Sequence, residues 1–396
     1  MLASLTKWCG RKYNLFDVMN NTLLSIVIPT RNRQKYCLAA VEQILSLNLE
    51  GIEVVIQDNS DDSSLQNLLD GYITSNGIVY NYRGGIVSFV DNFSEAISLS
   101  HGEYVCMIGD DDGILPNIIS VTKSAKQNGI DCVIAGLNAV YLWPNTEPIV
   151  PNSENGYLCV SYLRHKEVIA DSRKALKKLV EQGAQGYQNL DLPRVYHGIV
   201  KRSKMDDVKS VVGNYFDGLT PDIFIAVALS CVCERVIRLS YPVTVSGICP
   251  TSGSSNSATG RHTGELKDAP HFKGHDKYIW DSKIPAFYSV ETIWAETALH
   301  ALKDFGKNDL YSKFNIQYLD NLCLSKYPKY ANMIRQHAKD YGVKLCGTKV
   351  NKTFGAVLNL MSRIWKRLSH LGFGVRKYYD IYDLNTAVMI VRRYLR

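Results

Sequence analysis

The stretch YVCMIGDDDG, residues 104–113, runs from an apolar segment directly into three consecutive carboxylates. The first five residues, which are largely apolar, have the length and composition of a buried β-strand. In an open α/β sheet, ligands collect in the crevice beyond the carboxyl ends of the strands. The stretch therefore predicts that Asp110, Asp111 and Asp112 lie at a ligand-binding edge of a sheet.

Three carboxylates in a row repel one another. Two unit charges about 4 Å apart interact by roughly 1 kcal/mol in water and roughly 4 kcal/mol at an effective dielectric constant of 20. A divalent cation removes this repulsion, and Mg²⁺ and Mn²⁺ prefer carboxylate oxygens together with substrate phosphates. The triplet therefore indicates a site for Mn²⁺ or Mg²⁺, with Asp110 and Asp112 directed to one side and Asp111 elsewhere. The alternative is a solvated acidic turn that precedes a helix, whose N-terminal dipole favours negative charge.

Short apolar runs alternate with longer amphipathic ones on both sides of this stretch, from residue 23 to residue 136. This alternation is the signature of βαβ units and a largely parallel sheet. The apolar runs predict strands at residues 24–28, 53–57, 78–81, 104–108 and 132–136. Apolar residues at helical spacing predict helices at residues 36–46, 63–72, 89–99 and 116–127.

Polar side chains also follow the first two predicted strands. Pro29 halts the first strand and is followed by Thr30, Arg31 and Arg33, while Asp58 comes directly after the second. Arginine donates two hydrogen bonds at once to a phosphate, and an aspartate can accept from a nucleobase or from ribose hydroxyls. Together with the acidic triplet, these residues indicate a nucleotide site. The alternatives are surface charges for the arginines and a helix N-cap for the aspartate.

The composition is that of a folded globular protein, with 46% hydrophobic and 21% charged residues among 396 and a net charge of +7. The ten cysteines include no CxxC pair, which favours reduced thiols in a cytoplasmic protein. Residues 1–22 contain no apolar run long enough for a secretion signal. The run IFIAVALSCVC, residues 223–233, has about half the length needed to cross a bilayer and predicts a core helix.

The alternation weakens after residue 136. A basic helix is expected at residues 172–181, the run RVYHGIV (194–200) offers a further strand that returns to the sheet, and a Ser/Gly-rich loop spans residues 247–265. Beyond residue 280 the pattern is predominantly helical. We therefore expect three parts, which are an N-terminal extension (1–22), a catalytic domain (23–270) and a helical basic C-terminal region (271–396).

Four segments form an ordered set along the chain: SIVIPTRNR (25–33), VVIQDNSDD (54–62), YNYRGGIVSFVDNFSEAISLSHGEYVCMIGDDDG (80–113) and TPDIFIA (220–226). This set resembles the family 2 glycosyltransferases, which have the GT-A fold, an α/β fold with a Rossmann-like, mostly parallel central sheet. The resemblance extends over residues 1–265 and is strongest up to residue 120. The pair Asp110 and Asp112 resembles the DxD motif of that family.

The resemblance implies binding roles for individual residues. Pro29, Thr30 and Arg31 would line the nucleotide pocket with Arg33 beside them, and Asp58 would meet the base. Asn92 stands where the family often has an asparagine; its alternative is a buried polar residue that ties helix to loop. The remaining implied contacts are those of Arg83 with the nucleotide or its phosphates, of Asp110 and Asp111 with the donor, and of Asp110, Asp112 and His262 with the cation.

The resemblance also implies an inverting, metal-dependent transfer of a sugar from a nucleotide sugar, with a UDP-sugar as the first candidate. The acceptor would be a hydroxyl of a glycan or lipid-linked saccharide in bacterial surface-polysaccharide assembly. Asp222 would be the base and Asp217 the second choice; the alternative for Asp222 is a first-turn acid that faces a helix dipole. The Ser/Gly-rich loop would act as a lid, in which His262 is a metal or diphosphate ligand or merely solvated, and Arg261 could serve the phosphates.

The C-terminal region carries eight Lys or Arg residues and no Asp or Glu between Tyr341 and Tyr379, interspersed with Trp, Leu and Phe. This composition is typical of an interfacial anchor, which would place the protein on the inner face of the cytoplasmic membrane. The alternative is a helical appendage that packs on the catalytic domain. Nucleic acid is not an expected partner because no recognised binding module accompanies the charge. The basic residues are Lys344, Lys349, Lys352, Arg363, Lys366, Arg367, Arg376 and Lys377.

Two other functions fit parts of the pattern. A nucleotidylyltransferase would need a glycine-rich phosphate loop after the first strand, but PTRNRQK (29–35) contains no glycine, and GNYFDGLT (213–220) has Leu219 where a P-loop requires lysine. A catalytically inactive, membrane-recruited relative would have no need of a metal site. The intact acidic triplet favours chemistry.

Overall fold

The computed structural model describes residues 22–76, 78–146, 152–161, 165–252, 263–272, 278–345 and 375–395. The strands are β1 (Leu24–Thr30), β2 (Ile52–Asp58), β3 (Val79–Tyr82), β4 (Tyr104–Met107), β5 (Gly113–Ile114), β6 (Cys132–Ile134), β7 (Ala139–Leu142), β8 (Tyr157–Ser161), β9 (Glu167–Ile169), β10 (Ile199–Lys201), β11 (Val236–Leu239), β12 (Thr244–Ile248), β13 (Thr263–Gly264), β14 (Tyr288–Ser289) and β15 (Val375–Tyr379). The α-helices are α2 (Gln34–Ser46), α3 (Ser64–Asn76), α4 (Phe89–Ser98), α5 (Asn117–Gln127), α6 (Ser172–Glu181), α7 (Arg202–Val212), α8 (Pro221–Val232), α10 (Val290–Asp304), α11 (Asn308–Ser312), α12 (Ile316–Lys326), α13 (Ala331–Asp340) and α15 (Leu384–Arg392). Short 3-10 helices are η1 (Tyr187–Asn189), η2 (Leu266–Asp268), η3 (Pro270–Phe272) and η4 (Pro328–Tyr330).

An eight-stranded sheet lies at the centre of the molecule, in the order β3-β2-β1-β4-β10-β6-β11-β9. Strands β3, β2, β1 and β4 are parallel. Strand β10 runs antiparallel between β4 and β6, so β6 and β11 regain the direction of β4. The five strands expected from the sequence are present with their ends shifted by two residues at most, and RVYHGIV does return to the sheet, as β10. The predicted α/β fold with a mostly parallel central sheet is confirmed.

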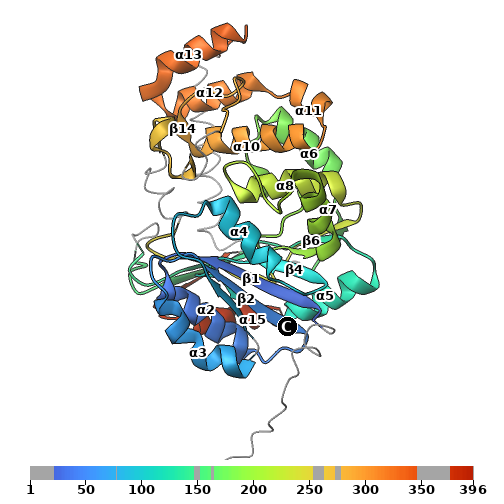
Figure 1. Ribbon diagram of the computed structural model, residues 1–396, viewed down its shortest axis with the longest axis vertical. Helices are drawn as coiled ribbons and strands as arrows, with labels where there is room; N and C mark the ends of the chain where they lie inside the picture. The colour runs from blue at the N-terminus through green and yellow to red at the C-terminus, as the bar shows by residue number, and fades with distance from the viewer. Residues whose placement is uncertain are drawn as a thin grey trace, which may run out of the picture.

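Apolar side chains cover both faces of this sheet. On one face, Ile26 and Ile28 pack with residues of α2, α3 and α5. On the other face, Val27 packs with residues of α4, α7 and α8. Successive residues of a strand point to opposite faces, and a parallel sheet is buried on both. This explains why β1 reads as an unbroken apolar run. Figure 1 shows α2 and α3 on one side of the strands and α4 and α8 on the other.

Helix α8 is the expected core helix. It begins with Pro221 at a permissive first position, and its residues from Ile223 to Ser230 are buried without a break. A helix that is apolar all round must be covered by protein or lipid, and here α7 and α10 pack against it. Within the described ranges, no helix has both the length and the apolar character needed to span a bilayer.

The region beyond Trp280 is predominantly helical, as expected from the sequence. Helix α10 packs on α8, α12 packs on α10, and α13 packs on α12. Figure 1 shows these helices stacked away from the sheet. The chain then passes through residues 346–374, which lie outside the described residues and contain five of the eight basic residues named above.

A second sheet brings the end of the chain back to the catalytic domain. Its order is β15-β8-β7-β12-β5, and β15 pairs with β8 from Val375 opposite Ser161 to Tyr379 opposite Tyr157. Helix α15 packs against α2 and β5. Thus Arg376 and Lys377 belong to a strand that packs on the catalytic domain, whereas the membrane expectation for residues 346–374 remains a prediction.

Candidate active site

The three carboxylates lie between β4 and β5, where the sequence places them, at the carboxyl edge of the parallel strands. All three are buried, with at most 4% of the residue exposed. Burial raises the pKa of Asp110, Asp111 and Asp112 to about 6, against 3.8 for a free aspartate, although hydrogen bonds and Arg33 act in the opposite direction. A solvated acidic turn would not show this burial, so the alternative of an exposed turn is wrong.

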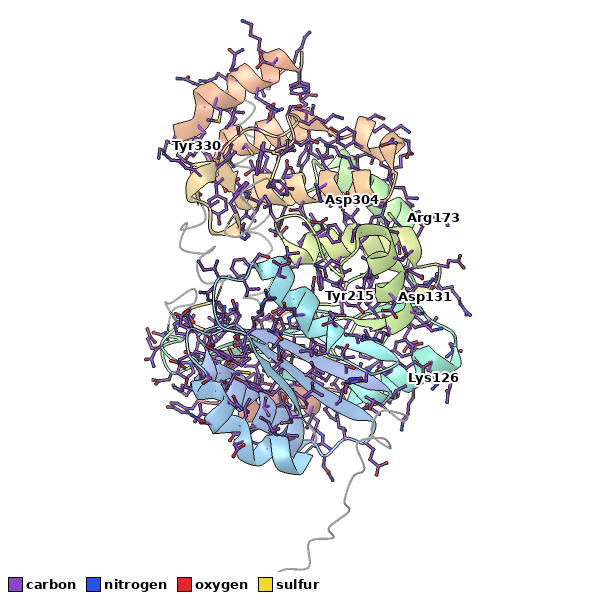
Figure 2. The ribbon with its side chains drawn as sticks, in the orientation of Figure 1. Lys126, Asp131, Arg173, Tyr215, Asp304 and Tyr330 are labelled. Atoms are coloured by element: carbon purple, nitrogen blue, oxygen red, sulfur yellow. The ribbon has the colours of Figure 1, made fainter. Side chains whose placement is uncertain are left out.

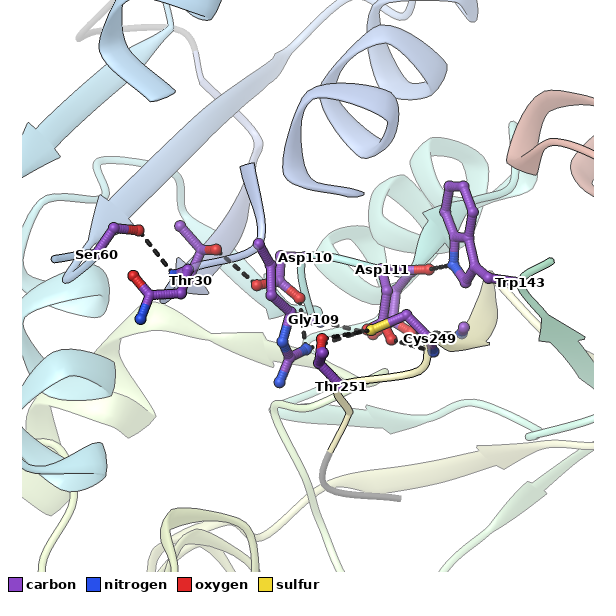
Figure 3. Close-up of polar contacts among 12 residues, drawn as sticks. Thr30, Ser60, Gly109, Asp110, Asp111, Trp143, Cys249 and Thr251 are labelled. Atoms are coloured by element: carbon purple, nitrogen blue, oxygen red, sulfur yellow. Dashed lines mark hydrogen bonds and ion pairs between the residues drawn. The ribbon is translucent and has the colours of Figure 1, made fainter. Parts of the chain in front are cut away.

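Asp110 is bound by two side chains from the end of β1. The hydroxyl of Thr30 donates to its Oδ2 at 2.6 Å, and Nη1 of Arg33 donates to its Oδ1 at 2.7 Å. The same Nη1 lies 3.9 Å from Oδ1 of Asp111. Figure 3 shows Thr30 and Asp110 joined in this way at the end of the strand. A single guanidinium group therefore faces two of the three carboxylates.

Asp112 is enclosed by protein donors. Its two oxygens accept from the backbone amides of Gly109 and Gly247, each at 2.6 Å, and Oδ2 also accepts from the Tyr196 hydroxyl at 3.2 Å. The sequence-based expectation paired Asp110 with Asp112, but in the structure Asp110 and Asp111 share Arg33. The reason is that the turn is tight enough for Asp112 to fold back onto the amide of Gly109, three residues earlier.

Asp111 connects the triplet to the second sheet. Its Oδ2 accepts from the backbone amide of Cys249 at 2.9 Å, and its carbonyl oxygen accepts from the indole of Trp143 at 2.9 Å; Figure 3 shows both partners beside it. The other carboxylate oxygen, Oδ1, is the one nearest Arg33. Asp110 and Asp111 thus offer hard oxygen ligands of the kind that Mn²⁺ and Mg²⁺ prefer, and such a cation would take the place of Arg33 as their positive partner.

Replacing Gly247 with alanine is expected to destabilise the protein by at least about 1–3 kcal/mol. A Cβ at this position would lie 1.8 Å from the carbonyl oxygen of Asp111, so the acidic turn would have to move. Thermal unfolding followed by circular dichroism measures the loss. Gly264→Ala is the matched control, because no atom of the described residues lies within 4 Å of the corresponding Cβ. Equal melting temperatures for the two variants would contradict the prediction.

The loop before β10 supplies contacts that the sequence analysis did not foresee. The hydroxyl of Tyr196 donates to Asp112, Nε2 of His197 lies 3.3 Å from the same oxygen, and Nδ1 of His197 lies 2.9 Å from the Thr244 hydroxyl oxygen. Burial lowers the pKa of His197 to about 3, so the ring is neutral. Because β10 is antiparallel, its N-terminal end lies at the carboxyl edge of its neighbours. This topology is the signal that would have placed these residues at the site.

A sharp reversal holds this loop against β4. Met107 N donates to Val195 O, and His197 N donates to Met107 O, each at 2.9 Å. His197 then adopts a φ of 57°, and a Cβ on Gly198 would lie 2.1 Å from the carbonyl oxygen of Arg194. Glycine is therefore required at position 198 for the chain to turn into β10.

Asp222, the predicted base, occupies the first turn of α8. Its Oδ2 accepts a hydrogen bond of 2.6 Å from the hydroxyl of Tyr187. Burial raises the pKa of this carboxyl group, although the hydrogen bond from Tyr187 acts against the rise. Tyr187 begins the same loop that ends with Tyr196 and His197. One segment therefore contacts both the predicted base and the acidic triplet. Asp217, the second choice for the base, has a different partner: its Oδ2 lies 3.4 Å from Nε2 of His300.

Asp58 lies at the end of β2, as expected, but is fully buried. It accepts from the backbone amide of Ser60 at 2.9 Å and from the hydroxyl of Tyr80 at 2.8 Å. The alternative of a cap for the next helix is wrong, because Asp62 accepts from the amide of Ser64 at the start of α3. Its contact with a nucleobase remains a prediction.

The other predicted residues occupy varied positions. Pro29 is buried within β1. Arg31 forms an exposed ion pair with Asp61 at 3.2 Å, and Arg83 pairs with Glu95 of α4. Asn92 is buried on α4, and its Oδ1 has no hydrogen-bond partner among the described residues. His262 and Arg261 lie outside the described residues, as does most of the Ser/Gly-rich loop.

A polar cavity lies at the carboxyl ends of β6 and β11, on the same edge of the sheet as the acidic triplet. Arg238 and Asp191 form an ion pair there, with Nε of Arg238 2.9 Å from Oδ1 of Asp191. In contrast, Nε of Arg194 and Oδ1 of Asn138 are buried and have no hydrogen-bond partner within the described part of the chain. Polar residues of the lining include Asn138, Gln188, Asn189, Asp191, Arg194 and Arg238. The loop from Tyr187 to His197 thus borders this cavity as well.

Sequence comparisons relate part of the chain to known proteins. The protein named colanic acid biosynthesis glycosyl transferase WcaA, from Escherichia coli K12, is 33% identical over 147 residues, which are 34% of this chain and 50% of that protein. Abequosyltransferase RfbV from Salmonella typhimurium is 27% identical over 114 residues, 28% of this chain and 34% of that protein. The chain thus spans half or less of the length of these curated relatives.

Among solved structures, S. aureus TarS in complex with UDP-GlcNAc is similar at 12% identity and a TM-score of 0.43, over 82% of this chain and 76% of that chain. A similarity of this size supports no conclusion about function. The sequence model of glycosyl transferase family 2, by contrast, matches residues 25–167, which include β1, β2, β4 and the acidic triplet. The similarity to glycosyl transferase family 2 thus covers the segment that holds the first four strands of the sheet and the acidic triplet.

Proposed function

We propose that the protein transfers a sugar from a nucleotide sugar to a hydroxyl group of a glycan or lipid-linked saccharide, with inversion at the anomeric carbon. The observation that carries the proposal is the buried acidic triplet, two of whose carboxylates face Arg33, at the end of the fourth strand of the segment that matches the family 2 model. The two curated relatives, named for colanic acid biosynthesis and for abequose transfer, support a role in bacterial surface-polysaccharide assembly.

The donor side of the site consists of Thr30, Arg33, Asp110 and Asp111. Asp110 and Asp111 would hold Mn²⁺ or Mg²⁺, and the bound cation would supply positive charge to the diphosphate as it leaves. Arg33, which now donates to Asp110 at 2.7 Å, would be released to donate to the phosphates, since its planar fork fits them well. Thr30 keeps Asp110 in place through its 2.6 Å hydrogen bond.

Asp222 would act as the base on the acceptor side. It takes the proton of the acceptor hydroxyl, the acceptor oxygen forms a bond to the anomeric carbon, and the electrons of the broken bond leave with the nucleoside diphosphate. The raised pKa of Asp222 makes it a stronger base than a solvated aspartate. Tyr187 holds the carboxylate in one orientation through its 2.6 Å hydrogen bond.

The polar cavity next to Tyr187 is the proposed acceptor site. It contains two guanidinium groups against one carboxylate, and Arg194 and Asn138 keep buried polar atoms without a described partner. Such groups favour a ligand rich in hydroxyls, because each unsatisfied buried atom is unfavourable by about 1–3 kcal/mol until it finds a partner. The loop that borders the cavity also contacts the proposed base through Tyr187 and the triplet through Tyr196, which supports this assignment.

Calorimetric titration with a panel of nucleoside diphosphates, with and without Mn²⁺, tests the donor half of this proposal. Binding of one nucleotide that requires the cation would support it and name the donor class; UDP is the first candidate. Release of a nucleoside diphosphate from the matching sugar nucleotide, measured with acceptor present, tests the transfer. Release of pyrophosphate would instead indicate a nucleotidylyltransferase, and absence of binding in a folded protein would indicate an inactive relative.

The affinity for Mn²⁺ is expected to fall as the pH is lowered through 6. The carboxyl groups of the triplet have pKa values raised by burial to about 6; above this pH they are ionised and can bind, and below it protons compete with the cation. At pH 5 the affinity should be about tenfold weaker than at pH 7.5 for each carboxylate that must ionise. Calorimetry at both pH values measures this, with circular dichroism to confirm folding. Equal affinities would contradict it.

The basic C-terminal stretch is the proposed contact with an anionic membrane surface, which would place the protein at the inner face of the cytoplasmic membrane. Its support is compositional, since five of the eight basic residues fall outside the described residues. Sedimentation with vesicles that contain anionic lipid, at low and high salt, tests it. Salt-sensitive binding is expected because each basic residue near such a surface contributes about 1 kcal/mol that salt screens.

A further inference from the structure

A second cluster of potential ligand atoms lies away from the acidic triplet, where the loop before α8 meets α10. His300 and Asp304 are four residues apart and therefore share one face of α10. Asp217 reaches them from the loop, whose next residues press against the same helix: Leu219 N donates to the Thr297 hydroxyl at 3.3 Å. Figure 2 labels Asp304, in the helical part of the molecule.

The three side chains converge on one point. Nε2 of His300 lies 3.4 Å from Oδ2 of Asp217 and 3.4 Å from Oδ2 of Asp304, and the three potential ligand atoms lie within 4.8 Å of one another. A hydrogen bond between such groups would normally measure about 2.7–3.2 Å. In contrast, ligands held about 2.0–2.1 Å from a tetrahedral Zn²⁺ lie about 3.3–3.4 Å apart. The spacing fits shared coordination better than hydrogen bonding.

Two of these atoms have ion-pair contacts but lack a hydrogen bond to any described residue. Nε2 of His300 and Oδ2 of Asp304 are buried, and neither has a hydrogen-bond partner in the part of the chain that the structure describes. A buried polar atom left in this state is unfavourable by about 1–3 kcal/mol. Their side chains as a whole remain 31% and 25% exposed, so an ion and a water molecule can reach them from solvent.

We propose that Asp217, His300 and Asp304 bind one divalent transition-metal ion, with water as the fourth ligand. One imidazole nitrogen that lies 3.4 Å from each of two carboxylate oxygens favours Zn²⁺. The ion ties the loop at Asp217 to α10, and this loop leads within five residues to Asp222. It therefore fixes the start of α8, which the proposed transfer reaction uses, but the binding site itself stands independently of that reaction.

A protonated His300 between the two carboxylates is the competing arrangement. Burial lowers the pKa of His300, but Asp217 and Asp304 raise it by more, so the net shift is upward. An imidazolium would hold the same three groups together without an ion. The two arrangements differ in one measurable respect, since only a neutral ring can take up Zn²⁺ at neutral pH.

Titration of the full-length, chelator-treated protein with Co²⁺ at pH 7.5, followed by Zn²⁺ competition, tests the proposal. We expect one equivalent of tetrahedral Co²⁺, visible in the absorption spectrum and displaced by Zn²⁺. His300→Ala and Asp304→Asn should each weaken this binding by on the order of 100-fold or more. Asp309→Asn, an exposed acid on the neighbouring helix α11, is the control and should bind as the parent protein does.

Co²⁺ binding at this cluster must be distinguished from cation binding at the acidic triplet. The double variant Asp110→Asn/Asp111→Asn removes the proposed donor-site cation and should keep the tetrahedral Co²⁺ signal. This signal does not depend on sugar transfer, so it should be present even if the proposed transfer reaction is not found. Zn²⁺ should also slow hydrogen exchange of the amides at residues 217–220. The proposal is overturned if the folded parent protein gives no tetrahedral Co²⁺ spectrum, or if His300→Ala and Asp304→Asn, both folded by circular dichroism, retain it.

Discussion

Replacing Asp222 with asparagine is expected to reduce turnover by about 10²- to 10⁴-fold, the usual contribution of a positioned general base. Asparagine has nearly the same shape and can still accept the hydrogen bond from Tyr187, so donor binding and stability should change little. The loss should therefore appear in kcat for sugar transfer, measured as release of nucleoside diphosphate with saturating acceptor. Calorimetry with the donor nucleotide checks that binding is retained.

A matched control separates catalysis from packing. Asp206 on α7 also accepts a tyrosine hydroxyl, from Tyr215 at 3.1 Å, but it plays no part in the proposed reaction. Asp206→Asn should leave turnover within about twofold of the parent enzyme. If Asp222→Asn keeps full turnover, Asp222 is not the base, and Asp217, the second choice from the sequence, becomes the residue to test.

Asp111→Asn and Asp112→Asn are expected to fail in different ways. Asp111 shares Arg33 with Asp110, so its loss should weaken cation-dependent nucleotide binding by about 100-fold or more, with a small effect on stability. Asp112 accepts from two backbone amides at 2.6 Å. An amide nitrogen in place of one oxygen would leave a buried donor facing a donor, which is unfavourable by about 1–3 kcal/mol.

Calorimetry and thermal unfolding of both variants distinguish these outcomes. Asp61→Asn, an exposed acid paired with Arg31, is the control and should match the parent protein in both measurements. If Asp112→Asn instead remains as stable as the parent and loses only cation-dependent binding, the assignment made from the sequence, with Asp110 and Asp112 as the metal ligands, is the correct one. The arrangement around Arg33 would then not describe the donor-bound state.

Local patterns were enough to predict most of the central sheet, though not β9 and β11, and the position of the acids. Apolar runs of strand length gave β1, β2, β3, β4 and β6 to within two residues at each end, because burial on both faces of a parallel sheet leaves little choice of residue. The position of Asp110 at the end of β4 followed from the same pattern. The burial of α8 followed from a helix-length run without a polar face.

The partners of the acids could not be predicted in this way. The backbone amide of Gly247, 135 residues from Asp112 in the chain, donates to the Asp112 carboxylate. The backbone amide of Cys249, 138 residues from Asp111, donates to the Asp111 carboxylate. No periodicity links such distant residues. Backbone amides also carry no sequence signature, so even a correct list of side chains would have missed them. The same holds for Tyr196 and His197, which depend on β10 being antiparallel.

By itself, the sequence determined which residues are buried in strands, which acids end a strand, and that this segment resembles the family 2 glycosyltransferases. Those properties depend on the hydrophobic pattern and on residue order, which are local. The tertiary structure decided which acids face Arg33, which one is enclosed by amides, and that Asp217 meets His300 and Asp304. These follow from contacts between distant segments, because a carboxylate turns toward the donors that packing brings to it.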